Sequence, residues 1–190
     1  MVNPQETKEL SDIDLVQLSK NGDQTAFMKI VKRHKSKVAA TIFGMLGKCD
    51  EADDIGQEVF IRFYKSINNF KGESALSTYL IRIAINLSLN EIQRRKRKRF
   101  FSFDKILEEG SDIGYIERTG EQKEIKEILD RALQKLNAKY RSVLVLRLID
   151  GYSTEETSKI LNIPLGTVLS RLTRAQSKLK EILQPYISYL

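Results

Sequence analysis

The chain reads Gly151-Tyr-Ser-Thr-Glu-Glu-Thr-Ser-Lys-Ile-Leu-Asn-Ile-Pro-Leu-Gly-Thr-Val-Leu-Ser-Arg-Leu-Thr-Arg-Ala175, a pattern typical of a helix, a tight turn and a second helix. Ser153 and Glu156 have the spacing of a capping box, in which two side chains satisfy amides at a helix start. Asn162 tolerates the left-handed backbone that a short turn needs, and Pro164 suits the first turn of the next helix. This stretch predicts a helix-turn-helix.

The second of these helices has two different faces. Apolar residues recur at steps of three and four, which predicts a buried stripe of Val168, Leu172, Ala175, Leu179 and Ile182. The opposite face carries small hydroxyls and a cation, with Arg171 on one flank: Ser170, Thr173, Arg174 and Ser177. Such a face fits the major groove of DNA. A helical hairpin with a solvated polar face is the alternative.

The charge of the chain favours a polyanionic partner. Its 190 residues carry a net charge of +7, with a pI of about 9.4, which suits nucleic acid or an anionic membrane. The charge is uneven, because a basic run extends from Arg94 to Arg99 and an acidic patch holds Asp50, Glu51, Asp53, Asp54 and Glu58. A membrane-surface role is not favoured, since the helix leading into the basic run ends in arginines and not in an apolar face.

The composition and the isolated cysteine and histidine predict a soluble cytoplasmic protein that is not an enzyme. The N-terminus is polar and acidic, no stretch approaches the length of a membrane span, and Cys49 stands alone. His34 lies between two cations and is expected at the surface, and Cys49, beside acidic residues, lacks the cationic setting that activates a thiolate. The acidic patch has no metal-ligand partners elsewhere, so we expect no metal and no cofactor, and interpret the patch as a docking face.

Helical periodicity covers nearly the whole chain and predicts an all-α protein of two small domains. We expect a tail at 1–11, a first domain at 12–99, a flexible linker at 100–122, where glycines interrupt the pattern, and a second domain at 123–190. The apolar run from residue 143 to residue 149 is expected to form the central helix of the second domain.

The first domain should contain an amphipathic helix from about 53 to 68, with acids near its start as the helix dipole prefers. A further helix from about Ser77 leads into the basic run and carries on one face Tyr79, Arg82, Asn86, Asn90 and Gln93. An aromatic ring, amides and guanidinium groups together favour opened or single-stranded DNA. An ordinary solvated helix face is the alternative, and Phe70, in the preceding loop, fits either a lid on the core or a base pocket.

Taken together, the two halves resemble the extracytoplasmic-function (ECF) class of bacterial RNA polymerase sigma factors. The resemblance covers nearly the whole chain, in the expected order. In region 2 of that class it rests on Asp53-Asp-Ile-Gly-Gln-Glu-Val-Phe-Ile-Arg-Phe63, Phe70-Lys-Gly-Glu-Ser74 and Thr78-Tyr-Leu-Ile-Arg-Ile-Ala-Ile-Asn86. In region 4, a helix-turn-helix of winged-helix-like type, it rests on Gly151-Tyr-Ser-Thr-Glu-Glu156 and Gly166-Thr-Val-Leu-Ser-Arg-Leu-Thr-Arg-Ala175.

The resemblance implies a dissociable specificity subunit, monomeric when free, with an anti-sigma factor as a further partner. It assigns binding of the clamp coiled coil of core RNA polymerase to Asp53, Asp54, Gln57, Glu58 and Arg62. It assigns recognition and melting of the promoter −10 element to Phe70, Lys71, Ser77, Tyr79, Arg82, Asn86, Asn90 and Arg94. It assigns the duplex −35 element to Thr167, Leu169, Ser170, Arg171, Thr173, Arg174 and Lys178, and it directs the linker toward the RNA exit path.

Some residues depart from the pattern of the class. Tyr79 stands where tryptophan is usual, and Leu169 and Gln176 stand where basic residues are common, so the −35 sequence preference is open. The competing interpretation is a homodimeric helix-turn-helix regulator that binds duplex DNA by itself. That interpretation gives no role to the acidic helix or to the Tyr79 face.

Overall fold

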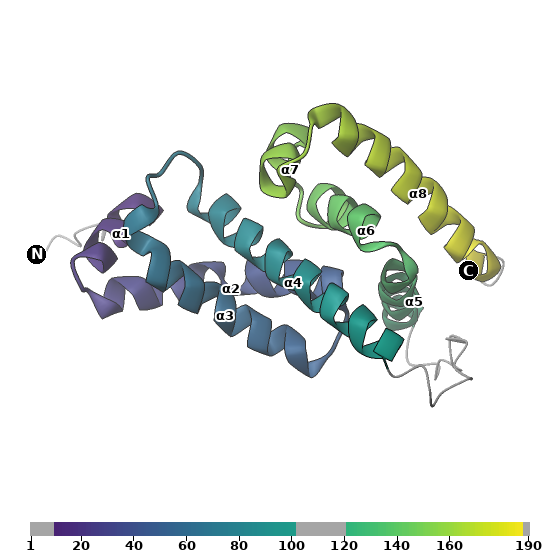
Figure 1. Cartoon of the computed structure of the whole chain (residues 1–190), viewed down its shortest axis with the longest axis horizontal. Helices are drawn as coiled ribbons and strands as arrows, with labels where there is room; N and C mark the ends of the chain where they lie inside the picture. The colour runs from purple at the N-terminus through teal and green to yellow at the C-terminus, as the bar shows by residue number, and fades with distance from the viewer. Residues whose placement is uncertain (1–9, 102–120, 188–190) are drawn as a thin grey trace, which may run out of the picture.

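The computed structural model describes residues 10–101 and 121–187, and these residues form helices and connecting turns with no strand. Figure 1 shows the first half of the chain, α1 to α4, beside the second half, α5 to α8. The expected all-α fold of two helical domains is confirmed. The expected linker lies almost wholly outside the described residues.

The first domain is a bundle built around two long helices. Its elements are α1 (Asp12–Lys20), α2 (Gln24–Leu46), α3 (Asp50–Ser66), the 3-10 turn η1 (Ile67–Asn69) and α4 (Leu76–Phe101). Side chains set the helix starts: Ser11 forms a capping box with Asp14, and Asp23 accepts from the first amides of α2. Phe63 of α3 is fully buried in the core.

The second domain contains the predicted helix-turn-helix. Its elements are α5 (Glu121–Lys135), α6 (Ala138–Leu144), the π-helical turn η2 (Val145–Ile149), α7 (Thr154–Leu161) and α8 (Leu165–Ile187). The capping box of Ser153 and Glu156 is present, and Asn162 adopts the left-handed conformation at φ 51°. The apolar run at 143–149, expected to be one central helix, is divided between the end of α6 and η2; its first four residues are buried, whereas Leu148 and Ile149 are exposed.

The two domains pack against each other along α2 and α4. α2 contacts η2, α5 and α6, while α4 contacts α7. One hydrophobic core therefore continues from the first domain into Val145, Leu146, Tyr152 and Ile160 of the second. The approach is close at Gly44, where an added Cβ would lie 2.9 Å from a methyl group of Val145.

Polar contacts accompany this packing. The guanidinium of Arg141, buried in α6, donates to the backbone carbonyl of Met45 at the end of α2, and burial lowers the pKa of Arg141 to about 10. The ammonium group of Lys37 lies 4.3 Å from the ring centre of Tyr152. The sequence periodicity predicted both domains but contained no sign of this interface.

None of the helices that the structure describes is long and apolar enough to cross a membrane.

Candidate nucleic-acid interface

The outward face of α8 carries the polar residues that the sequence placed there. Ser170, Thr173 and Arg174 are exposed, whereas Val168 and Ala175 are fully buried on the opposite side. Both hydroxyls donate to backbone carbonyls of their own helix, Ser170 to Thr167 at 3.1 Å and Thr173 to Leu169 at 3.2 Å. Their oxygens therefore face outward mainly as acceptors, while Arg174 is the cationic donor of this face.

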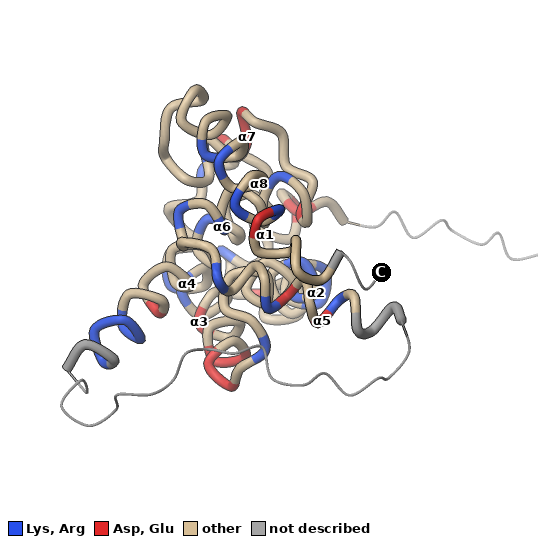
Figure 2. The backbone as a smooth tube through the Cα atoms, turned by 90° about the vertical axis from the view of Figure 1, so that its right-hand side faces the viewer, with Lys and Arg blue, Asp and Glu red and all other residues tan. Residues whose placement is uncertain are grey.

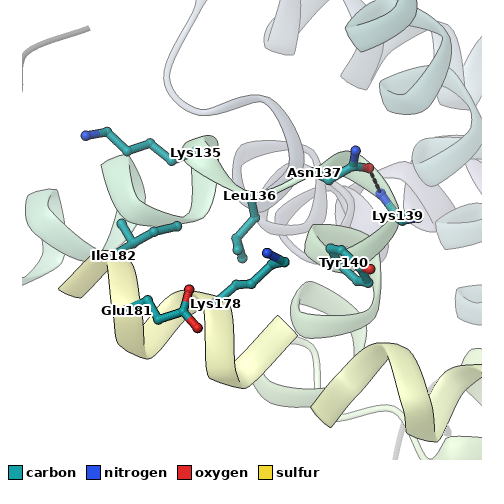
Figure 3. Close-up of a pocket in the computed structure, with 8 residues that line it drawn as sticks. All are labelled: Lys135, Leu136, Asn137, Lys139, Tyr140, Lys178, Glu181 and Ile182. Atoms are coloured by element: carbon teal, nitrogen blue, oxygen red, sulfur yellow. Dashed lines mark hydrogen bonds between the residues drawn. The ribbon is translucent and has the colours of Figure 1, made fainter. Parts of the chain in front are cut away.

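Two other predicted DNA contacts, Arg171 and Lys178, lie on a flank of α8. Arg171 is half-buried and lines a hollow of about 270 Å³ with Leu89, Ile92 and Gln93 of α4. Lys178, two turns further on, extends toward the turn between α5 and α6 and lines a second pocket of about 380 Å³ (Figure 3). Arg171 and Lys178 therefore lie closer to the other helices of the protein than Arg174, which is exposed. Of the other two predicted residues, Thr167 is half-buried and Leu169 is exposed.

The outward face of α4 also matches the sequence projection. Asn86 and Asn90 are exposed, and Ser77 and Arg82 are half-buried. The Nε atom of Arg82 is buried and has no hydrogen-bond partner among the described residues. Because this nitrogen is buried, an acceptor from outside does not reach it in this conformation, and the exposed amides of Asn86 and Asn90 supply the accessible donors and acceptors of this face.

Tyr79 belongs to an aromatic cluster and is not a free platform. Its ring meets the rings of Phe70 and Phe63 edge-on, at centroid distances of 5.2 and 5.9 Å. Phe70 is 6% exposed, so it forms a lid on the core, one of the two roles that the sequence left open. The neighbouring Lys71 is exposed, and Lys20 donates to the carbonyl of Phe70 at 2.8 Å.

The basic run at the end of α4 divides into two parts. Arg94 and Arg95 turn toward α3 and pair with carboxylates, whereas Lys96, Arg97 and Lys98 are exposed and make no ion pair within the described part of the chain. Figure 2 shows this helix end as a basic segment at the edge of the molecule. Arg94 is thus the predicted −10 contact whose charge is already engaged within the protein.

The acidic face of α3 is exposed as predicted. Asp53, Asp54 and Gln57 are exposed, and Arg62 donates to Glu58 at 2.7 Å, an exposed pair one helical turn apart. Two apolar residues of this helix that were not predicted as site residues are also exposed, Ile61 at 46% and Tyr64 at 49%. The available signal was their spacing, because they follow Gln57 by four and seven residues and so extend the same face.

Two expectations from the sequence are wrong. His34 is 8% exposed and lies 3.0 Å from a carboxylate oxygen of Asp12, because α1 folds back along α2 and covers it. Cys49 does have a cationic neighbour, since Arg95 donates to its sulfur at 3.0 Å. Among the described residues, no group of three or more His, Cys, Asp or Glu side chains is arranged to hold a metal ion.

Comparison with known proteins agrees with this division into two functional halves. The family model for sigma-70 region 2 matches residues 30–98, and the model for sigma-70 region 4 matches residues 126–179. Helices α4 and α8, which carry the exposed polar faces described above, lie largely within these matched segments.

Relatives match along almost the full chain. The RNA polymerase sigma-H factor of Pseudomonas aeruginosa is 34% identical over 187 residues, covering 93% of this chain and 95% of that protein. The ECF RNA polymerase sigma factor SigW of Bacillus subtilis is 37% identical over 173 residues, covering 87% and 92%. The fold is shared with the sigma factor RpoE of Bartonella quintana, solved with the anti-sigma factor NepR, at a TM-score of 0.67 and 24% identity over 83% of this chain and 96% of that one.

A region 2 bundle followed by a region 4 helix-turn-helix defines the chain as a sigma-70 type factor. It belongs to the ECF family of bacterial RNA polymerase sigma factors.

Proposed function

We propose that this sigma factor binds core RNA polymerase through α3 and directs it to promoters by reading the −10 element with α4 and the −35 element with α8. One observation carries the proposal: two polar, cationic helix faces point away from a shared core, while acids gather on a third helix. A protein that bound duplex DNA alone would need only the face of α8.

The docking surface for polymerase would be the exposed side of α3. Asp53, Asp54 and Gln57 supply acceptors, and the exposed Ile61 and Tyr64 supply apolar area on the same helix. A surface with charged acceptors around an apolar centre suits a stable protein interface. Because Glu58 and Arg62 already pair with each other, we propose that they contribute less than the two unpaired aspartates.

The −10 element would be opened and held along α4. Opening a base pair costs a few kcal/mol, and stacking on an aromatic ring returns about 1–3 kcal/mol per base. Tyr79 packs edge-on against Phe70, so a base stacking on Tyr79 would meet a ring that is already fixed in place. The exposed amides of Asn86 and Asn90 would then contact base edges or phosphates, and the half-buried Arg82 would join them once its side chain turns outward.

The −35 element would be read as duplex by α8. Arg174 projects from the exposed face, and an arginine in that position matches the two acceptors of guanine in the major groove. Arg171, on the flank, is better placed for a phosphate. Two small domains held on one polymerase need little individual affinity, because the first contact raises the effective concentration of the second.

A regulatory partner also belongs to this proposal. The RpoE sigma factor of Bartonella quintana, which shares this fold, was solved with an anti-sigma factor. We propose that an anti-sigma factor likewise masks this chain and that the free sigma factor is a monomer.

Transcription in vitro tests the proposal directly. The purified chain should direct core polymerase to a discrete set of start sites on genomic DNA, and core alone should not. The alternative, a homodimeric regulator, predicts instead a palindromic footprint by the chain without polymerase. That footprint, together with no start sites, would overturn the proposal.

A further inference from the structure

A cluster of four charged side chains joins the end of α4 to the start of α3. The carboxylate of Glu91 accepts from Arg94 at 2.6 and 2.8 Å and from Arg95 at 2.8 Å. Arg95 also donates to Glu51 of α3 at 2.9 Å, and Arg94 lies 3.7 Å from the same carboxylate. We call these four residues the Glu91 cluster.

Glu91 is the buried centre of this cluster. Its side chain is 9% exposed, whereas those of Arg94, Arg95 and Glu51 are each at least one third exposed. Hydrogen bonds from Arg94, and then from Arg95, hold the pKa of Glu91 below its usual value. A buried carboxylate with paired arginines holds those arginines in a fixed orientation, because releasing either one leaves the buried charge with only one cationic partner.

The cluster reaches the beginning of the helix proposed to dock on polymerase. Cys49, the N-cap residue of α3, makes no capping hydrogen bond with its side chain. Arg95 instead holds this end by donating to the sulfur of Cys49 and to Glu51, one residue into α3. Asp53 and Asp54, the two unpaired acids of the docking surface, follow in the same first turns.

On the other side, the cluster borders the DNA-facing side of α4. At about 100° per residue, Arg94 projects next to Asn90 on the flank of that side, while Glu91 and Arg95 project toward α3. The guanidinium of Arg94 is engaged by Glu91, whereas Lys96, Arg97 and Lys98, which follow within the next four residues, are exposed. The carboxylate of Glu91 therefore decides whether the charges of Arg94 and Arg95 are available to DNA.

We propose that Glu91 is a positioning residue that turns Arg94 and Arg95 away from DNA phosphates and uses them to brace the start of α3. By withholding two cations, it limits sequence-independent DNA binding by the free sigma factor. By bracing α3, it supports binding to polymerase. The second effect rests on the proposed function, whereas the first is measured without polymerase.

The test is the salt dependence of binding to a labelled duplex of random sequence, with the full chain and the Glu91→Gln variant. Each phosphate contact adds about 0.9 to the slope of log affinity against log salt. Release of both arginines should steepen this slope by about one to two units, so that the variant loses about 4-fold to 16-fold more affinity than wild type between 50 and 200 mM salt. Its affinity for core polymerase should fall at the same time.

A charge-matched control separates release of the arginines from the change in net charge. Asp130→Asn removes one acid from α5, where the side chain of Asp130 is exposed and holds no arginine among the described residues, and should leave the slope unchanged. Arg94→Gln in the wild-type background should also leave it unchanged, because Arg94 is already engaged. In the Glu91→Gln background, Arg94→Gln should make the slope of log affinity against log salt shallower by about one unit.

A purely structural role gives a different result. Glu91→Gln would then weaken binding to DNA and to polymerase together, with an unchanged or shallower slope, and this outcome overturns the proposal. If Glu91→Gln does not fold, Glu51→Gln, at the exposed end of the cluster, should steepen the slope in the same direction by a smaller amount. An unchanged slope in that variant also overturns it. Failure of the wild-type chain to bind polymerase, with the slopes as expected, would contradict the proposed function and not this inference.

Discussion

The hydroxyl of Thr41 in α2 donates a 2.8 Å hydrogen bond to the carboxylate of Asp150, which follows η2 in the second domain. Lys37 also contacts Tyr152, and Arg141 donates to the carbonyl of Met45. Region 4 therefore packs on α2 through three polar contacts in this structure.

Gly44→Ala should separate the domains without weakening α2. The added methyl would lie 2.9 Å from Val145, a clash that costs about 1–3 kcal/mol, while alanine favours the helix by up to about 1 kcal/mol. Small-angle scattering should show a larger radius of gyration than for wild type. Gly56→Ala is the matched control, because its nearest neighbour would be Ile42 at 3.9 Å; equal radii in all three proteins would contradict the packing.

Asp150→Asn should make the free energy of unfolding less dependent on pH. Burial raises the pKa of Asp150 above its usual value of 3.8, so the folded state favours the protonated acid. Its stabilising contribution is therefore complete below about pH 3.8 and is lost as the pH rises through the raised pKa. Asparagine keeps an acceptor for Thr41 but does not ionise. Denaturant unfolding from pH 3.5 to 7 should show a smaller decline with rising pH in the variant, and identical profiles would refute this.

Asp53→Lys combined with Asp54→Lys should abolish binding to core polymerase. Charge-assisted contacts at such an interface contribute about 1.5–3 kcal/mol each, and lysine also introduces repulsion. Both side chains are exposed, so the circular dichroism should not change. The double asparagine variant should give an intermediate affinity, measured by fluorescence anisotropy. Wild-type affinity in the lysine variant would exclude this surface.

Asn86→Ala should reduce promoter opening without reducing stability. Asn86 is exposed, whereas Tyr79 packs on Phe70, so the asparagine separates DNA contact from folding more cleanly than the tyrosine does. Permanganate reactivity of unpaired thymines should fall, and a premelted bubble across the −10 element should restore much of it. Gln17→Ala, an exposed polar position on α1, serves as control. No rescue by the bubble would indicate a duplex-reading or structural face.

Arg174→Ala should relax the preferred base at one position of the −35 element, at a cost of about 1–3 kcal/mol. Arg171→Ala should weaken all promoters alike and lower the salt slope by about one unit. Transcription from promoters randomised at the −35 element distinguishes the two. If Arg174→Ala weakens every sequence equally, its assigned role is incorrect.

Local patterns predicted the local features of this molecule. The capping box at Ser153, the turn at Asn162 and the stripe of α8 each depend on residues a few positions apart, and all three were found where expected. The errors concern pairs that are distant in sequence. His34 is covered by Asp12 and Cys49 meets Arg95, and periodicity carries no information on such pairs. The packing of region 4 on α2 was missed for the same reason.

The hollow shared by Gln93 of α4 and Arg171 of α8 has a consequence for geometry on the promoter. The −10 and −35 elements are about 25 base pairs apart, which is about 85 Å along B-form DNA. Because α4 and α8 together line one hollow of about 270 Å³, the faces proposed to read these two elements lie much closer together than this separation. Simultaneous reading of both elements by α4 and α8, as proposed, would therefore require the second domain to move away from α2, and the hydrogen bond between Thr41 and Asp150 would then break.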